Sequence, residues 1–89
     1  MVKIEFDGVI FQEGNAYIAH SPKLDVSSCG STVEEARSNL QTAVRLFLEE
    51  AERMGTLEEI LAESGYSRSK TGRWETPRLV ATEFMTVEA

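Results

Sequence analysis

The 89-residue sequence contains a single cysteine, Cys29, and no long apolar stretch. One cysteine excludes an intramolecular disulfide and a zinc site built from several cysteines, and it favours a reducing cytoplasm. No apolar run approaches the ~18 residues that a membrane-spanning helix needs. The N-terminal residues 1–8 (MVKIEFDG) carry an early acid and no apolar core segment, so we expect no signal peptide.

The length allows one domain over residues 1–89 and a core of modest size, so oligomerisation is expected to add stability. The formal net charge is −6, and its distribution is uneven. Residues 1–65 contain twelve acids and five bases, whereas residues 66–89 contain three acids and four bases. Because an acidic surface repels phosphate and attracts basic partners, this balance disfavours nucleic-acid binding by the chain alone.

The N-terminal third has the alternating pattern of β-strands. Apolar and polar residues alternate over 2–12, which predicts a half-buried strand. The alternation slips at Gly8, which predicts a bulge or a strongly bent strand there. Residues 13–15 (Glu-Gly-Asn) predict a tight hairpin turn. Two further strands are expected at 16–20 and 24–29.

A long amphipathic helix is predicted next. Thr32 and Glu35 have the spacing of an N-terminal capping box, and Gly30 is expected to let the chain turn just before it. Apolar residues then recur three and four apart as far as Met54, on one stripe of the helix. Gly55 is a typical C-terminal cap.

Thr56 and Glu59 repeat the capping spacing and predict a short second helix that ends near Glu63. Residues 67–77 are polar and rich in turn formers, which predicts a mobile loop. Residues 78–88 return to alternation, with apolar residues on both faces, and predict a strand. Burial at a subunit contact would explain two apolar faces, so we expect a homo-oligomer, a dimer or higher, that forms through this strand.

These elements together predict an α+β fold in the order β-β-β-α-α-β. A three-stranded antiparallel sheet plus a C-terminal strand would be covered on one face by the two helices.

The side chains with potential for catalysis are few. His20 and Cys29 are expected on neighbouring strands, but nothing nearby marks a cation that would stabilise a thiolate. We therefore expect a structural or solvent-facing role for His20 and a buried or half-buried Cys29. The junction at residues 30–32 has no lysine of a phosphate-binding loop. We expect no enzyme, no catalytic residues, no metal site and no cofactor; the rival hypothesis is a hydrolase that uses His20, Cys29 or the Asp7 carboxylate.

Two charged sets are candidate binding surfaces. The first set, for a basic protein partner, is the acidic face of the long helix together with an acid at the sheet edge: Asp25, Glu34, Glu35, Glu49, Glu50 and Glu52. The second set, for nucleic acid, combines basic residues with an aromatic ring that could stack on a base: Arg68, Lys70, Arg73, Trp74 and Arg78. An alternative interpretation of the tryptophan is a lid over the core or an interface residue.

The order of motifs over residues 16–66 resembles the HicB family of antitoxins from bacterial type II toxin–antitoxin pairs. The shared pattern is an aromatic residue in a strand, a proline two residues before a leucine, a short strand that ends in glycine, and Thr-x-x-Glu-Ala at the start of a long helix. The residues that carry the resemblance are Tyr17, Pro22, Leu24, Gly30, Thr32, Glu35 and Ala36. The match covers about residues 2–66.

The resemblance implies an incomplete RNase H-like or dsRBD-like domain without catalysis of its own. It also implies a partner, a small basic RNA-cleaving toxin of the HicA type, which this protein would bind and mask. Many family members carry a C-terminal helix-turn-helix or ribbon-helix-helix domain that binds the operon's promoter. Residues 67–89 are too few and too strand-like for a helix-turn-helix, so we expect a stand-alone domain without that activity.

Overall fold

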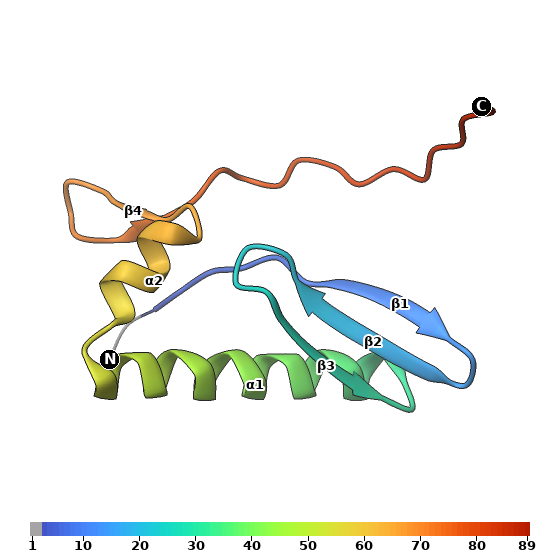
Figure 1. The fold of residues 1–89 in the computed structure, drawn as a ribbon, viewed down its shortest axis with the longest axis horizontal. Coiled ribbons are helices and arrows are strands. Elements are labelled where there is room, and N and C mark those ends of the chain that lie inside the picture. Colours follow the sequence, from blue (N-terminus) through green and yellow to red (C-terminus); the bar gives the residue numbers. More distant parts are fainter. Residues whose placement is uncertain (1–2) are drawn as a thin grey trace.

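The computed structural model describes residues 3–89 and has an antiparallel sheet lying along one long helix (Figure 1). The sheet has the order β1-β2-β3. A short helix and a two-stranded hairpin follow the long helix. The elements are β1 (Val9–Glu13), β2 (Ala16–Ser21), β3 (Val26–Gly30), α1 (Val33–Met54), α2 (Leu57–Glu63), β4 (Ser67–Arg68) and β5 (Trp74–Glu75). The predicted α+β fold with a three-stranded antiparallel sheet is confirmed.

The register of the sheet decides which side chains face α1. Ile10 lies opposite Ala19, and Ala19 is fully buried in the core beneath the sheet. Val9 and Phe11 lie opposite His20 and Ile18, on the other face, because side chains alternate along a strand. The run of three apolar residues at 9–11 therefore reflects a sheet with apolar positions on both faces.

The first strand of the structure, β1, is shorter than the strand predicted over 2–12. Residues 3–8 are extended but belong to no strand, and β1 begins only at Val9. Residue 2 lies outside the described residues. The predicted bulge at Gly8 is wrong: Ile4, Phe6 and Ile10 all pack against the core, so the alternation continues through the glycine. A Cβ at Gly8 would lie 3.2 Å from Leu40 Cδ2, on the same face.

The caps of α1 agree with the prediction. The Oγ1 atom of Thr32 accepts a hydrogen bond of 3.0 Å from the backbone N–H of Glu35. The Glu35 carboxylate in turn accepts a 3.0 Å bond from the backbone N–H of Ser31, one residue earlier than in the standard capping box. At the other end Gly55 is left-handed, with φ of 77°, as expected of a helix C-cap.

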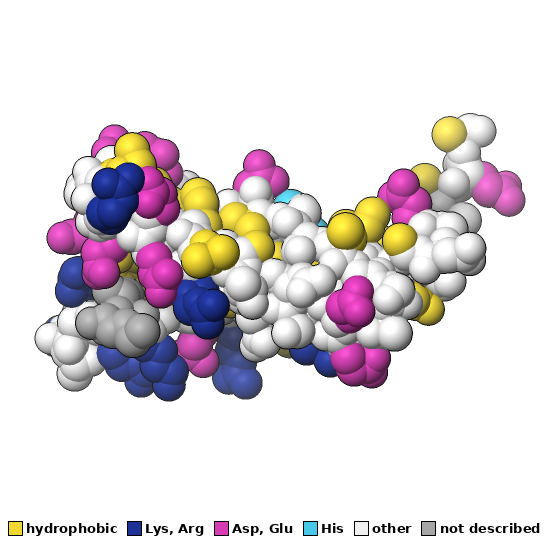
Figure 2. All heavy atoms as spheres, turned by 90° about the horizontal axis from the view of Figure 1, so that it is seen from below, with side chains coloured by type: hydrophobic (Ala, Val, Ile, Leu, Met, Phe, Trp, Pro, Cys, Tyr) yellow, Lys and Arg dark blue, Asp and Glu magenta, His cyan; other side chains and the backbone are white. Residues whose placement is uncertain are grey.

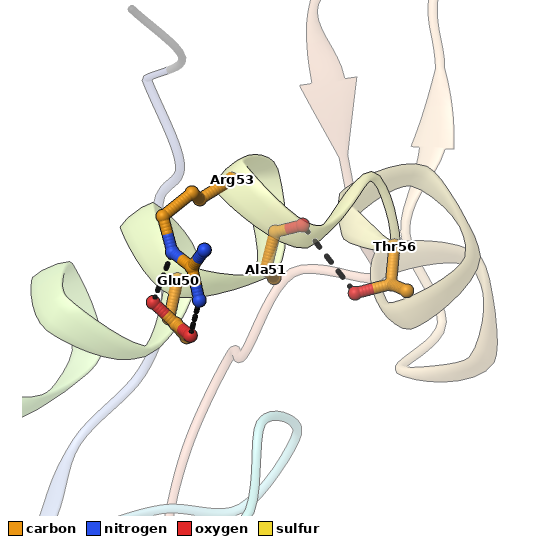
Figure 3. A network of polar contacts seen from close by, with 4 residues as sticks. All are labelled: Glu50, Ala51, Arg53 and Thr56. Atoms are coloured by element: carbon orange, nitrogen blue, oxygen red, sulfur yellow. Dashed lines mark hydrogen bonds and ion pairs between the residues drawn. The ribbon is translucent and has the colours of Figure 1, made fainter.

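Two expectations about turns need correction. Gly30 does not have a positive φ; it is required by space, because a Cβ there would lie 2.6 Å from the backbone nitrogen of Ala36. Thr56 precedes α2 but its side chain makes no capping bond. Its hydroxyl instead donates to the carbonyl of Ala51 at 3.3 Å, at the end of α1 (Figure 3).

The core lies between the sheet and α1 and continues to α2. Its buried residues are Ala19, Leu24, Ala36, Leu40, Val44, Ala51, Leu57, Leu61 and Tyr66. The Tyr66 hydroxyl donates a 2.6 Å hydrogen bond to the carbonyl of Glu5, which fixes the N-terminal segment beside α2. Ser21 is also fully buried, and its hydroxyl has no hydrogen-bond partner within the described residues.

The C-terminal region differs most from the prediction. The segment expected to be a loop contains the hairpin of β4 and β5, in which Arg68 pairs with Trp74. The strand expected at 78–88 is wrong for the single chain, because these residues are extended and belong to no strand. We call residues 78–89 the C-terminal arm. In Figure 1 the arm leaves the hairpin and ends away from the body of the molecule.

Candidate partner-binding surfaces

The six acids of the first predicted set do not form one face. Asp25 lies in the turn between β2 and β3, with a left-handed φ of 54° and an exposed side chain. Glu34 and Glu35 lie in the first turn of α1, and Glu49, Glu50 and Glu52 lie near its end. At ~1.5 Å per residue the two helical groups are roughly 22 Å apart. The structure therefore divides the set into three separate places.

The acids at the end of α1 lie close to further acids on α2. The turn at Gly55 and Thr56 brings α2 beside the end of α1, and α2 contributes three more acids. We call this set the acidic end; it consists of Glu49, Glu50, Glu52, Glu58, Glu59 and Glu63. Sequence reasoning missed its α2 members, although the predicted turn between the helices was a sufficient signal.

The acidic end has an excess of negative charge. Residues 49–63 contain six acids and one base, Arg53. Figure 2 views the molecule from the side of α1 and shows charged side chains concentrated where α1 meets α2, with basic side chains among the acidic ones. The middle of α1 in the same view shows fewer charged side chains.

Two of the predicted acids are engaged within the chain. Arg53 donates two hydrogen bonds to the Glu50 carboxylate, the one from Nε at 2.9 Å (Figure 3). This hydrogen bonding lowers the pKa of Glu50 and raises the pKa of Arg53. Glu35 is held by Ser31 in the cap of α1. Within the described residues Glu49 and Glu52 form no ion pair, so their carboxylates remain available to a partner.

A groove separates residues 3–8 from α1. It is made of two adjoining hollows of about 320 and 390 Å³ that share Ile4, Phe6 and Gln41. The groove exists because α1 packs mainly beneath β3 and β2 and contacts β1 little. We call it the N-terminal groove. Its floor is apolar, and both basic and acidic side chains lie along it. The apolar residues are Ile4, Phe6, Ile10, Leu40, Val44 and Leu48, and the charged ones are Lys3, Arg37, Arg45, Glu5, Glu49 and Glu52.

The second predicted set, for nucleic acid, lies on and after the β4–β5 hairpin. The guanidinium carbon of Arg68 lies 4.6 Å from the centre of the Trp74 ring, over its face, and Trp74 is half-buried against the core. Arg68 also lies 3.9 Å from Glu58, and Arg73 lies 3.7 Å from Glu5. An arginine thus covers one face of the ring that was expected to stack on a base, and acids offset two of the basic charges.

The residues considered for catalysis lie on or near the face of the sheet that is turned away from α1. His20 Nδ1 is 2.7 Å from Ser27 Oγ, and His20 Nε2 is 3.9 Å from the Asp25 carboxylate, which is almost fully exposed. Cys29 is exposed on the same face, so the expectation of a buried or half-buried cysteine is wrong. Side chains alternate between the two faces along β3. Cys29 therefore lies on the exposed face with Ser27, and not on the half-buried face with Val26 and Ser28.

Asp7 lies apart from this group, 3.8 Å from Lys23. Over residues 3–89, no three or more His, Cys, Asp or Glu side chains gather in an arrangement that could hold a metal ion. In the same residues no helix is both long and apolar enough to cross a membrane. No family model, curated protein or solved structure matches this chain.

Proposed function

We propose that this protein is a non-catalytic, antitoxin-like binding protein that masks a small basic RNA-cleaving toxin of the HicA type. The observation that carries the proposal is the acidic end, two adjoining helices that carry six carboxylates and one arginine over residues 49–63. The proposal places the protein in the cytoplasm, where RNA is cleaved and where the exposed thiol of Cys29 would stay reduced.

Charge complementarity supports this choice of partner. A ribonuclease binds its substrate through lysine and arginine side chains that contact phosphates. A surface rich in carboxylates offers the same sign of charge to those side chains, and it also accelerates the encounter of the two proteins. Masking needs occupation of the RNA-binding surface and no chemical step, so it requires no catalytic group in the inhibitor.

The exposed acids that have no internal partner are the best candidates for direct contacts. Glu49 and Glu52 lie one turn apart on α1 and border the apolar N-terminal groove. A partner could therefore combine ion pairs with apolar contact, and apolar contact is the part of an interface that supplies most affinity. Glu50 is expected to contribute less, because Arg53 already holds it.

The test is inhibition of RNA cleavage by a purified HicA-type toxin from the same genome. We expect the full chain to suppress cleavage at equal concentration. The double variant Glu49→Gln, Glu52→Gln should bind at least tenfold more weakly, with a smaller dependence of affinity on salt. Glu34→Gln, at the opposite end of α1, is the matched control and should inhibit like the unmodified chain.

Two results would contradict the proposal. One is failure of the full chain to bind or inhibit the toxin at low salt. The other is binding of duplex DNA or RNA at low salt that is lost on replacing Lys70 and Arg78 by Gln, which would favour the nucleic-acid hypothesis instead. Inhibition that is equally sensitive to Glu34 and to Glu49 would exclude the acidic end as the contact surface.

A further inference from the structure

The C-terminal arm exposes apolar side chains that the rest of the chain does not cover. Phe84 is 100% exposed, and Val80, Val87 and Met85 are 90, 89 and 78% exposed. They lie on both faces of the arm, because they include even and odd positions of an extended segment. An uncovered apolar segment of this kind marks an interaction site.

The same chain carries an open sheet edge. The outer edge of β1 and the extended residues 3–8 pair with no strand in the described structure. The opposite edge of the sheet is better covered, since the side-chain amide of Asn39 on α1 donates a 2.8 Å bond to the carbonyl of Cys29 on β3. The β1 edge is therefore the place where a strand can be added.

We propose that two copies of this chain exchange their C-terminal arms. The arm of each copy lies along β1 and residues 3–8 of the other copy, as an added edge strand. The lengths are similar, because the open edge over 3–13 has eleven residues and the arm over 78–89 has twelve.

The start of the arm is fixed close to this edge. The Lys23 ammonium group donates a 2.6 Å hydrogen bond to the carbonyl of Pro77 and lies 3.8 Å from Asp7, just before β1. Leu79 and Thr82 line a small hollow together with Val9. Because the arm leaves the body at the same edge on which it would bind, a two-fold axis can bring both arms and both edges into one closed contact.

Binding to a second copy accounts for the two apolar faces of the arm better than binding to the chain's own sheet edge does. One body has a single helical layer, on one face of its sheet. A strand added to its own sheet would bury one apolar face and leave the other in water, together with a new unpaired edge. In the exchanged pair the partner's body and arm can cover the second face.

The oligomeric state in solution tests the proposal. Sedimentation equilibrium at 1–100 µM protein should give twice the chain mass of 9.9 kDa for the unmodified chain. The variant Val80→Asp, Phe84→Asp should be a monomer, or should dissociate at least tenfold more readily. Both substitutions are in the arm, outside the core, so the helical signal of α1 and α2 in far-UV circular dichroism should be retained. Leu46→Asp, at an exposed apolar site on α1, is the matched control and should remain a dimer.

Hydrogen exchange identifies the surface. Amides of residues 3–8 and of the arm should be protected in the unmodified dimer, and should exchange rapidly in Val80→Asp, Phe84→Asp. A monomer at 100 µM, a dimer that survives the arm substitutions, or a monomer whose arm amides are protected would each overturn the proposal. The last result would show that the arm binds its own sheet. These readouts need no toxin, so they stand independently of the proposed function.

Discussion

Replacement of Gly30 by alanine tests a close approach of sheet and helix. Gly30 ends β3, and an added Cβ would lie 2.6 Å from the backbone nitrogen of Ala36 and 2.9 Å from the Glu35 carbonyl carbon. Ordinary contacts between such atoms are about 3.5 Å, so the first turn of α1 would have to move by roughly 0.9 Å. Backbone atoms cannot rotate away as the end of a side chain can.

The free-energy cost has three parts. Overpacking of this kind costs about 1–3 kcal/mol. Displacement of the first turn also weakens the cap formed by Thr32, which is worth ~1 kcal/mol. Alanine loses less conformational entropy than glycine on folding, and this difference offsets roughly 0.5–1 kcal/mol of the destabilisation. We expect Gly30→Ala to lower the free energy of unfolding by about 2 kcal/mol, which corresponds to a fall in Tm of roughly 8–16 °C for a domain of this size.

Urea denaturation followed by circular dichroism measures the effect. Ser28→Ala is the matched control, because Ser28 lies two residues earlier on the same face of β3 and loses only a hydroxyl group. The control should change the free energy of unfolding by less than about 0.5 kcal/mol, as expected of a site without a special structural role. An unfolding free energy for Gly30→Ala within the same margin of the unmodified chain would refute the steric argument.

Three further predictions concern single side chains. Thr32→Ala should lower the free energy of unfolding by ~1 kcal/mol, since it removes the N-terminal cap of α1. Thr56→Ala should cost less, since the Thr56 hydroxyl makes no capping bond to α2 and only a long bond, of 3.3 Å, to the Ala51 carbonyl at the end of α1; equal effects in urea denaturation would contradict this. Tyr66→Phe removes the hydrogen bond to Glu5 and should cost about 0.5–1.5 kcal/mol near neutral pH. Burial, with the negative charges of Asp7 and Glu5, raises the pKa of Tyr66. The contribution of the protonated Tyr66 to stability is therefore complete below about pH 10 and is lost as the pH rises through the raised pKa. Denaturation at pH 7 to 12 should show this loss of stability in the unmodified chain and a smaller loss in Tyr66→Phe. Ser21→Ala removes a buried hydroxyl without a partner and should leave stability unchanged or raise it by about 1 kcal/mol; a measured loss would indicate a bound water.

Local features of the fold could be predicted from the sequence because their signals are local. Thr32 and Glu35 begin α1 through a bond between residues three apart, and Gly55 ends it through its own backbone conformation. The hairpin between β1 and β2 likewise depends on Gly14, with φ of 63°. In each case the residues that decide the structure are neighbours in the chain.

Features that depend on distant contacts could not be predicted in the same way. The alternation at 78–88 indicates a strand, but a strand also needs a partner, and the single chain provides none. The need for glycine at position 30 comes from the packing of α1, which periodicity does not reveal. The acids were expected on one helix face, but the turn at Gly55 groups half of them with α2 instead.

The bond between Tyr66 and Glu5 also bears on the order of events during synthesis. Glu5 leaves the ribosome 61 residues before Tyr66 does. At the usual ~5–20 residues per second this interval is roughly 3–12 s. Throughout it Ile4 and Phe6 lack the group that later holds their segment in place, so we expect the nascent chain to expose these two apolar side chains. Truncated chains that end before residue 66 should accordingly be cleaved by protease near their N-terminus, and chains that extend beyond it should be protected there.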